Sequence, residues 1–371
     1  MLIGLPKEIK SQEYRVGMVA SSIKELVTRG HKVIVEKNAG AGINVTDQHY
    51  LQAGAEIVDS AAEVYAHADM IIKVKEPQPE ECKMLREGQV VFTYLHLAAE
   101  PKLAERLLAS GVVAIAYETV TDRFGGLPLL SPMSEVAGRM SIQAGAHCLE
   151  KAQHGRGVLL GGVPGVEAAD VVVIGGGVVG TNAVRVAIGM EANVMVIDSS
   201  LHRLRELDLQ FGAKLTTIFS TKHAIEEYVA QADLVIGAVL IPGAAAPKLV
   251  TREMLKTMKP GSVVVDVAID QGGCFESSRP TTHDKPTYEE CGVVHYCVTN
   301  MPGAVPRTST FALKNATLPF ILDLADKGYK QALLDNPHLL NGLNIFNGYV
   351  TNLAVADALS KQYVPAKEVL I

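Results

Sequence analysis

The sequence predicts an α/β protein of two domains, each built on a parallel β-sheet with helices on both faces. Three observations lead to this fold class. The chain has 371 residues, which is more than a single domain usually holds. Gly, Ala and Val carry much of its apolar content, whereas aromatic residues make up only 5%. Short β-rich apolar runs also alternate with helical stretches, as they do in parallel sheets covered by helices.

The first domain is expected to begin with residues 1–130. Its predicted strands are the apolar runs at 2–5, 33–35, 70–74, 90–92 and 112–116. The stretches between them that have helical character are 21–29, 61–66, 80–86 and 101–109. This alternation predicts a parallel sheet with helices on its faces.

The second domain is expected to span residues 131–306. Ser134 is predicted to cap a long helix that runs to about Lys151. A Gly-rich loop then leads to strands predicted at 170–174, 193–197, 234–238, 263–267 and 293–297. This order is typical of a doubly wound nucleotide-binding domain.

After about Pro306 the strand signals stop, and residues 313–327 and 347–361 look helical. A helical tail of this size is too small to form a domain and has to pack on one. We expect it to return to the first domain, which would then be discontinuous and comprise 1–130 plus 307–371. Packing on the second domain is the alternative.

Charge and hydropathy argue against several classes of protein. The net charge is −6 and the basic residues are scattered, which favours no nucleic-acid partner. An uncharged stretch between Asp233 and Lys248 holds two prolines and is too short for a membrane helix. The N-terminus lacks the basic flank and cleavage pattern of a signal peptide. We therefore expect a cytoplasmic protein that is not bound to a membrane.

The five cysteines form no Cys-x-x-Cys pair, and their odd number fits reduced thiols in the cytosol. Cys291, His295 and Cys297, with His283 nearby, could be drawn as a metal cluster. Their spacing matches no zinc pattern, so buried or loop thiols are the better interpretation and no metal is expected.

A glycine-rich turn is the first sign of function. The segment Gly175-Gly176-Gly177-Val178-Val179-Gly180 satisfies G-x-G-x-x-G, follows an apolar strand and opens a helix. Gly175 permits the tight turn, Gly177 lets the backbone approach a pyrophosphate, and Gly180 lets helix and strand pack closely. The helix N-terminus offers N–H groups to phosphates. A glycine-rich turn of some other α/β protein is the alternative.

Asp198 indicates which dinucleotide would bind. It ends the strand after the glycine turn, where its carboxylate can accept hydrogen bonds from the adenosine ribose hydroxyls. Its charge would repel a 2′-phosphate, so NAD is favoured over NADP. Arg203 and Arg205 weaken this prediction, because arginine can hold such a phosphate.

Four polar residues stand out as candidates for chemistry. Lys75, His96 and Asp270 each follow a predicted strand, and Arg15 lies between a strand and a helix. Ligands of parallel α/β sheets gather outside the carboxyl ends of the strands, and a cleft between the domains would bring these residues together. Each has an ordinary alternative: Arg15 and Lys75 could be solvated cations, His96 a structural histidine and Asp270 a turn residue. Lys73 is also as good a candidate as Lys75.

Several segments together resemble the alanine dehydrogenase family, over essentially the whole chain. They are Gly4-Leu5-Pro6-Lys7-Glu8 with Glu13-Tyr14-Arg15-Val16, Lys73-Val74-Lys75-Glu76-Pro77, Thr93-Tyr94-Leu95-His96-Leu97-Ala98, the segment from Ser131 to Arg139, the glycine turn, Val267-Ala268-Ile269-Asp270-Gln271-Gly272-Gly273, and the segment from Thr299 to Pro306.

The resemblance implies two Rossmann-like domains, the first closed by the C-terminal helices, and commonly a homohexamer. It implies that Arg15 and Lys75 bind the substrate carboxylate, that Asn300 also contacts the substrate, that His96 is the acid/base residue and that Asp270 is its acidic partner near the nicotinamide. It implies NAD contacts, beside the glycine turn, by Ser134, Val178, Val179, Asp198, Arg203, Ser220, Val239, Leu240, Val267, Ala268, Ile269, Asp270, Arg279, Val298, Thr299, Asn300 and Met301.

The implied reaction is the reversible oxidative deamination of L-alanine to pyruvate and ammonium. A histidine suits the proton transfers that water addition and ammonia loss require. The alternatives are the NAD(H)-binding alpha part of a transhydrogenase, a dehydrogenase of the lysine or saccharopine type, and a non-catalytic NAD-binding regulator.

Overall fold

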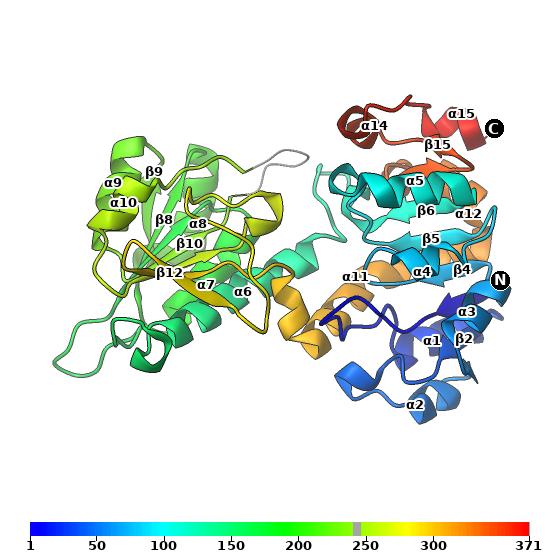
Figure 1. Ribbon diagram of the computed structural model, residues 1–371, viewed down its shortest axis with the longest axis horizontal. Helices are drawn as coiled ribbons and strands as arrows, with labels where there is room; N and C mark the ends of the chain where they lie inside the picture. Colours follow the sequence, from blue (N-terminus) through cyan, green and yellow to red (C-terminus); the bar gives the residue numbers. More distant parts are fainter. Residues whose placement is uncertain (240–245, 371) are drawn as a thin grey trace. The chain divides into compact units, whose positions relative to one another are not determined.

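The computed structural model describes residues 1–239 and 246–370 (Figure 1). Leu240, one of the predicted cofactor contacts, lies outside these described residues. The chain divides into two compact units. Unit 1 comprises Met1–Met133 and Val305–Ile371, and unit 2 comprises Ser134–Ala304.

Unit 1 is built on an eight-stranded sheet with the order β15-β14-β6-β5-β4-β1-β2-β3. The strands are β1 (Leu2–Leu5), β2 (Lys32–Glu36), β3 (Glu56–Val58), β4 (Met70–Ile72), β5 (Val90–Thr93), β6 (Val113–Ala116), β14 (Leu343–Phe346) and β15 (Tyr349–Val350). The first six are parallel. Their order, β3-β2-β1-β4-β5-β6, is that of a doubly wound sheet, in which the strand order reverses between β1 and β4.

The prediction that strand signals stop at Pro306 is wrong. β14 pairs antiparallel with β6, and β15 pairs antiparallel with β14, so the sheet is mixed rather than wholly parallel. The helix expected at 347–361 is correspondingly shorter, Leu353–Leu359. β14 is only four residues long and fully buried, and periodicity cannot distinguish so short an apolar run from a helical segment.

Two layers of helices cover the sheet of unit 1. The core on one face contains Ile3, Val35, Ile72 and Phe92, and the core on the other face contains Ile34, Ile71 and Val91, because side chains alternate along a strand. The helices that pack on the first face are α1 (Ala20–Thr28), α2 (Asp47–Gln52), α11 (Pro306–Lys327), α12 (Tyr329–Asp335), α13 (Pro337–Leu340) and α15 (Ala366–Leu370). Those on the second face are α3 (Ala61–His67), α4 (Pro79–Cys82), α5 (Pro101–Ser110) and α14 (Leu353–Leu359).

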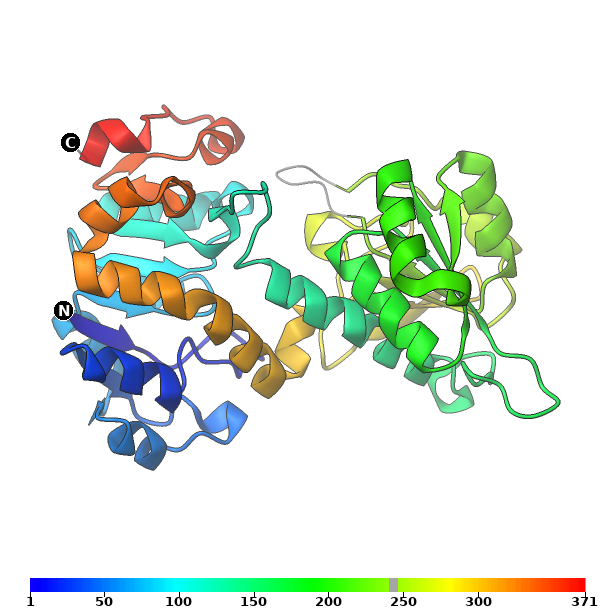
Figure 2. The same cartoon turned by 180° about the vertical axis from the view of Figure 1, so that it is seen from behind.

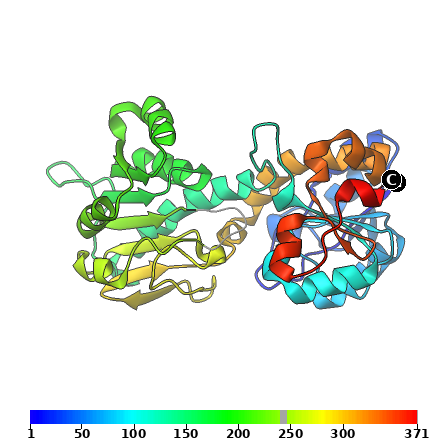
Figure 3. The same ribbon diagram turned by 90° about the horizontal axis from the view of Figure 1, so that it is seen from above.

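The figures show these layers directly. In unit 1, α5 lies in front of the sheet in Figure 1, and α11 lies in front of it in Figure 2. Figure 3 shows the same sheet between its two helical layers. The C-terminal segment therefore contributes both helices and strands to the unit that begins at Met1.

Unit 2 is built on a seven-stranded sheet with the order β12-β13-β11-β10-β7-β8-β9. The strands are β7 (Asp170–Ile174), β8 (Asn193–Asp198), β9 (Thr216–Phe219), β10 (Leu234–Gly237), β11 (Val263–Asp266), β12 (Thr287–Glu290) and β13 (Val293–Tyr296). All neighbours are parallel except the edge strand β12, which is antiparallel to β13. The six parallel strands repeat the doubly wound order, with the reversal between β7 and β10.

The helices of unit 2 also form two layers. The core that contains Val171 and Val173 receives α6 (Ser131–Cys148), α7 (Val178–Gly189) and α8 (Leu201–Phe211). The core that contains Val172 receives α9 (Lys222–Gln231) and α10 (Arg252–Thr257). Among the described residues, no helix is long and apolar enough to cross a membrane.

The predicted role of Ser134 as a helix cap is wrong. α6 begins at Ser131, so Ser134 lies inside the helix. Pro132 occupies the first turn, where the missing N–H and fixed φ of proline fit a helix start. The helix also ends at Cys148, three residues before the expected end.

Candidate active site

Three predicted residues of unit 1 follow neighbouring parallel strands. Arg15 lies between β1 and α1, Lys75 follows β4, and His96 follows β5. Because β1, β4 and β5 are adjacent in the sheet, the three residues share its carboxyl edge. Arg15 and Lys75 flank the point where the strand order reverses, which is where ligands bind in such sheets.

Arg15 is buried and held by a neighbouring carboxylate. Its Nε donates to Glu13 Oε1 at 2.6 Å and its Nη2 donates to Glu13 Oε2 at 2.5 Å. Its Nη1 contacts Met133 Sδ at 3.2 Å, and only 2% of the residue is exposed. A bidentate pair of this kind fixes the plane of a guanidinium, so Arg15 is a rigid cation rather than a solvated one.

Lys73 and Lys75 occupy different environments. Lys73 is fully buried, and its ammonium donates to Glu8 Oε2 at 3.0 Å and to Glu81 Oε1 at 2.8 Å. Lys75 is partly exposed, and its backbone is fixed by Glu8 Oε1, which accepts from Lys75 N at 3.3 Å, and by the hydroxyl of Thr93, which donates to Lys75 O at 2.9 Å. Of the two lysines, Lys75 is the one accessible to a ligand.

The buried cluster around Lys73 contains two carboxylates and one ammonium. Burial raises the pKa of Glu8, and the nearby charge of Lys73 opposes that effect. The Glu8 carboxylate also accepts a hydrogen bond of 2.6 Å from Val74 N. Glu8 therefore fixes the backbone between β4 and Lys75.

His96 is presented to solvent by an unusual backbone conformation. Its φ is 50°, in the left-handed region that non-glycine residues rarely adopt. The carboxylate of Glu118 accepts hydrogen bonds from His96 N at 2.6 Å and from Leu95 N. The imidazole ring of His96 stacks on the ring of Tyr94, with the centroids 5.7 Å apart. The His96 side chain is 45% exposed. The geometry matches an accessible proton-transfer group better than a structural core histidine.

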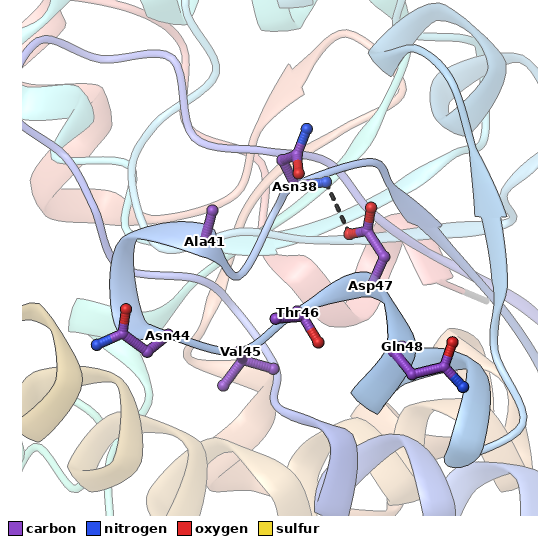
Figure 4. Close-up of a pocket in the computed structure, with 7 residues that line it drawn as sticks. All are labelled: Asn38, Ala41, Asn44, Val45, Thr46, Asp47 and Gln48. Atoms are coloured by element: carbon purple, nitrogen blue, oxygen red, sulfur yellow. Dashed lines mark hydrogen bonds between the residues drawn. The ribbon is translucent and has the colours of Figure 1, made fainter.

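Two pockets lie next to each other in unit 1 and share Asn38. The larger, about 390 Å³, is lined by Asn38, Ala41, Asn44, Val45, Thr46, Asp47 and Gln48 (Figure 4). The Asp47 carboxylate in it already accepts a hydrogen bond from Asn38 N at 2.8 Å, and it contains no predicted site residue. The smaller pocket is lined in part by Arg15, Glu13 and Glu8, so it is the one that concerns the candidate site.

The glycine turn of unit 2 lies between β7 and α7, at the reversal of strand order. Gly175 has a φ of +100° and approaches Ala238 O, which would lie 2.7 Å from an added Cβ. A Cβ at Gly180 would lie 1.8 Å from Gly175 O. At Gly177 a Cβ would meet no protein atom within 4 Å, so packing does not demand glycine there. The open space at Gly177 fits the approach of a pyrophosphate to the backbone.

Asp198 and Arg203 both bind the backbone of this turn. Asp198 Oδ2 accepts from Gly176 N at 2.7 Å, and its Oδ1 accepts from Ser200 N at 2.8 Å. Arg203 donates from Nε to Gly176 O at 2.6 Å, from Nη2 to Thr181 Oγ1 at 2.6 Å, and from Nη1 to Glu206 Oε2 at 2.5 Å. Arg203 is thus held in place with a carboxylate beside it.

The other predicted cofactor residues of unit 2 follow its strands or lie on its helices. Those that follow β9, β10, β11 and β13 are Ser220, Val239, Val267, Ala268, Ile269, Val298, Thr299, Asn300 and Met301. Those on helices are Ser134, Val178 and Val179. Arg279 stacks on the ring of Tyr288, with its Cζ 3.9 Å from the centroid. Asp270 is exposed on a short 3₁₀ helix, Ile269–Gln271.

Several supporting residues were not identified from the sequence. Glu8, Glu13 and Glu118 fix the backbone or side chain of a predicted site residue in unit 1, and Asp266 does so in unit 2. All four are carboxylates: Asp266 ends β11, Glu8 and Glu118 lie two or three residues after β1 and β6, and Glu13 lies further along the loop after β1. An acidic residue close to a candidate cation or histidine, at the edge where ligands gather, is the signal that could have found them.

Two family models match the chain over most of its length. The N-terminal domain of "Alanine dehydrogenase/PNT" matches residues 4–137, and its C-terminal domain matches residues 141–353. Alanine dehydrogenase from Halomonas elongata is 59% identical over 370 residues, covering 100% of both chains. Alanine dehydrogenase from Bacillus subtilis is 56% identical, covering 100% of this chain and 98% of its own.

Solved structures agree with the family models. An L-alanine dehydrogenase superposes with a TM-score of 0.94 and 51% identity, covering 97% of this chain and 99% of that one. A transhydrogenase from Sinorhizobium meliloti gives a TM-score of 0.84 with 27% identity, covering 94% and 100%. The chain therefore belongs to the alanine dehydrogenase/PNT family.

Proposed function

We propose that the protein is an NAD-dependent L-alanine dehydrogenase that reversibly converts L-alanine to pyruvate and ammonium. The observation that carries this proposal is the match to relatives named alanine dehydrogenase, which runs at 56–59% identity along both units. The site geometry supports it, because a rigid arginine, an accessible lysine and an exposed histidine lie at one edge of the unit 1 sheet.

The cofactor would bind unit 2. Gly177 leaves open space beside the start of α7 for the pyrophosphate, and the Asp198 carboxylate would accept hydrogen bonds from the adenosine ribose. Arg203 is held by Thr181 and Glu206, so it is poorly placed to neutralise a 2′-phosphate. These features favour NAD over NADP. When bound, NAD would supply the redox chemistry by accepting a hydride, that is two electrons and one proton, from the α-carbon of alanine.

The substrate would bind unit 1. Arg15 and Lys75 would hold the carboxylate, because paired cations at a preorganised site orient an anion without reorganising. His96 would transfer protons when water adds to the imine carbon and when ammonia leaves. Its exposure and its anchored backbone suit this role. In unit 2, Asn300 is proposed as a further substrate-binding residue, and Asp270 as an acidic residue for proton transfer.

The main alternative is the NAD(H)-binding part of a transhydrogenase. The structural likeness to the transhydrogenase of S. meliloti favours it, although at 27% identity this is a more distant relative than the alanine dehydrogenases. A transhydrogenase exchanges hydride between nucleotides and needs no substrate acid or base. His96 and Asp270 therefore argue against it. A lysine- or saccharopine-type dehydrogenase and a non-catalytic NAD-binding regulator remain as further alternatives.

One assay separates these functions. NADH formation should be rapid with L-alanine and absent with L-lysine, with D-alanine and without an amino acid. Transfer of hydride from NADH to an oxidised NAD analogue in the absence of any amino acid would instead support the transhydrogenase alternative. NADH binding without turnover of any amino acid would support the regulator.

We further propose that the protein is a homo-oligomer, most simply the hexamer that its family resemblance implies. Apolar side chains on the turn around the Val163–Val166 bridge support association. Leu159, Val163 and Val166 are 64%, 54% and 64% exposed, and apolar groups gathered on a surface are typical of interaction sites. Sedimentation velocity at micromolar concentration tests this, and a monomer would contradict it.

A further inference from the structure

The loop that follows β11, residues 267–278, carries the exposed Asp270 and is held by two charged residues. One is Asp266, the last residue of β11, which is fully buried. The other is Lys248, which belongs to a segment that runs beside this loop, with Val250 and Phe275 forming an isolated parallel bridge. Neither residue was singled out from the sequence.

Asp266 binds the N–H groups of the loop. Its Oδ1 accepts from Ala268 N at 3.0 Å, and its Oδ2 accepts from Cys274 N at 2.9 Å and from the hydroxyl of Ser278 at 2.5 Å. Gly273 has a φ of +77°, and an added Cβ would lie 2.5 Å from Asp266 Oδ2. The loop thus closes around this carboxylate, and only glycine fits at position 273.

Lys248 binds the carbonyl groups of the same loop. Its Nζ donates to Gly272 O at 2.5 Å, to Gly273 O at 2.9 Å and to Phe275 O at 3.1 Å. An ammonium has three N–H donors, so these three carbonyls account for all of them. A lysine engaged in this way acts as a structural anchor even though the residue is exposed.

We propose that Asp266 and Lys248 are positioning residues that together fix the loop 267–278 and so orient the carboxylate of Asp270 for the reaction. Asp266 engages the donors of the loop, and Lys248 engages its acceptors. The two sets of bonds bracket Asp270 in the sequence, at 268 on one side and at 272–278 on the other. The inference rests on the proposed function only for what Asp270 does.

Asp266→Asn and Lys248→Met test the proposal. An asparagine has one acceptor oxygen and one donor NH₂, so in either orientation the N–H of Ala268 or of Cys274 faces a donor. Lys248→Met removes all three bonds to carbonyls from an exposed position, so this variant should fold even if Asp266→Asn does not.

Each variant has a matched control in unit 2. Asp233→Asn alters another buried carboxylate, which accepts from Asp170 N at 2.9 Å at the opposite edge of the sheet. Lys256→Met removes an exposed lysine that pairs with Glu253 on α10. The controls change the same kinds of residue without touching the loop.

The first measurement is amide hydrogen exchange of residues 267–278. Both loop variants should speed it about tenfold or more, because opening a segment becomes easier when its bonds are lost, and the controls should not. This measurement needs no substrate, so it reports the opening of the loop even if the proposed function is wrong. Exchange that is unchanged in both loop variants would overturn the proposal.

The second measurement is the kcat of L-alanine oxidation per folded protein. We expect Asp266→Asn and Lys248→Met to lower kcat by about 10- to 100-fold, the effect of a small misplacement of a reacting group, with the KM for L-alanine near that of the wild type. Both controls should keep the wild-type kcat. Faster exchange with an unaltered kcat would show that the loop does not orient Asp270, and would also overturn the proposal. A wild-type protein that does not oxidise alanine would refute the proposed function instead.

Discussion

The carboxylate of Glu8 accepts a hydrogen bond of 3.0 Å from the ammonium of Lys73, both groups being buried in unit 1. The second oxygen of Glu8 binds the backbone N–H of Val74 and of Lys75. A buried lysine held by two carboxylates thus helps to fix the turn that carries Lys75, the lysine proposed to bind the substrate. Two residues that look equivalent in the sequence therefore lie in different environments, one buried and one partly exposed.

Substitution of Lys73 should lower the stability of the protein, whereas substitution of Lys75 should lower its activity. Lys73→Met leaves Glu8 and Glu81 buried without their cation, and breaking a buried pair costs about 3–5 kcal/mol, so the melting temperature should fall sharply. Lys75→Met should leave the melting temperature near the wild-type value and lower kcat/KM for L-alanine by about 10²–10³-fold, the effect of losing one preorganised charge-stabilising group.

Lys83→Met provides the control for charge loss, because Lys83 is 70% exposed and pairs only with Glu80 in the described structure. Its kcat/KM and melting temperature should match those of the wild type. A Lys75→Met enzyme with full activity would contradict the assignment of Lys75 to the substrate.

His96 should be essential for turnover and dispensable for folding. His96→Asn is the suitable substitution, because asparagine tolerates the left-handed backbone that His96 adopts. The kcat per folded site should fall by about 10²–10⁴-fold, while the dissociation constant of NADH and the melting temperature stay close to wild type, since the ring is 45% exposed.

His154→Asn is a matched control, because His154 is also exposed and has a φ of 66°. It should keep full activity. If His96→Asn instead lowered the melting temperature and left the kcat of the folded fraction unchanged, His96 would be a structural histidine.

The Rossmann-like character of both units could be predicted because their strands are short apolar runs between helices. Such runs are visible at Val171–Val173 and at Met70–Ile72 in the printed sequence. The positions of Lys75, His96 and Asp270, after β4, β5 and β11, could be predicted for the same reason. Position in a parallel sheet is encoded locally, since each strand has a recognisable carboxyl end.

What the sequence could not provide depends on long-range packing. The edge strand β14 pairs with β6 across more than two hundred residues, and its own four residues carry no distinctive period. Likewise, nothing in the segment Lys73-Val74-Lys75 distinguishes the buried lysine from the accessible one. The distinction arises from Glu8 and Glu81, which lie on other elements.

The cofactor preference should depend on charge around the glycine turn. The wild-type protein should favour NAD over NADP by about 100-fold or more in kcat/KM, because a like charge beside Asp198 costs several kcal/mol and each 1.4 kcal/mol is about tenfold. Asp198→Ala should reduce that ratio. Both cofactors should also bind less tightly in this variant, since Gly176 N and Ser200 N lose their acceptors.

Glu206 should limit how far Asp198→Ala alone can shift the preference. Glu206 pairs with Arg203 Nη1, so Asp198→Ala with Glu206→Gln should move the ratio further toward NADP than Asp198→Ala does. The ratio of kcat/KM values measures this. Equal use of NAD and NADP by the wild type would contradict the role of Asp198.

The stability of the protein should decline below about pH 6.5 in part because of His295. This residue is fully buried, with Nδ1 donating to Val293 O at 2.9 Å and Nε2 accepting from the hydroxyl of Ser277 at 2.7 Å. Burial lowers the pKa of His295, Arg279 and Arg252 lower it further, and Val293 O and Glu290 oppose them. In the window between this lowered pKa and about 6.5, the unfolded chain binds a proton that the folded chain does not. Folding stability therefore falls as the pH falls through that window, by up to about 1.4 kcal/mol per pH unit.

His295→Gln should remove this contribution, because glutamine does not titrate. The variant should be less stable than the wild type at about pH 7.5, where hydrogen bonds and the stacking on Tyr288 are lost. It should then lose less stability than the wild type between about pH 7.5 and about pH 5.5. Denaturant unfolding at the two pH values, at one protein concentration, measures the difference. His202→Gln is the control, since the His202 side chain is 83% exposed, and it should follow the wild type. A His295→Gln variant whose stability falls as steeply as that of the wild type would show that His295 takes up its proton in the folded state as readily as in the unfolded one.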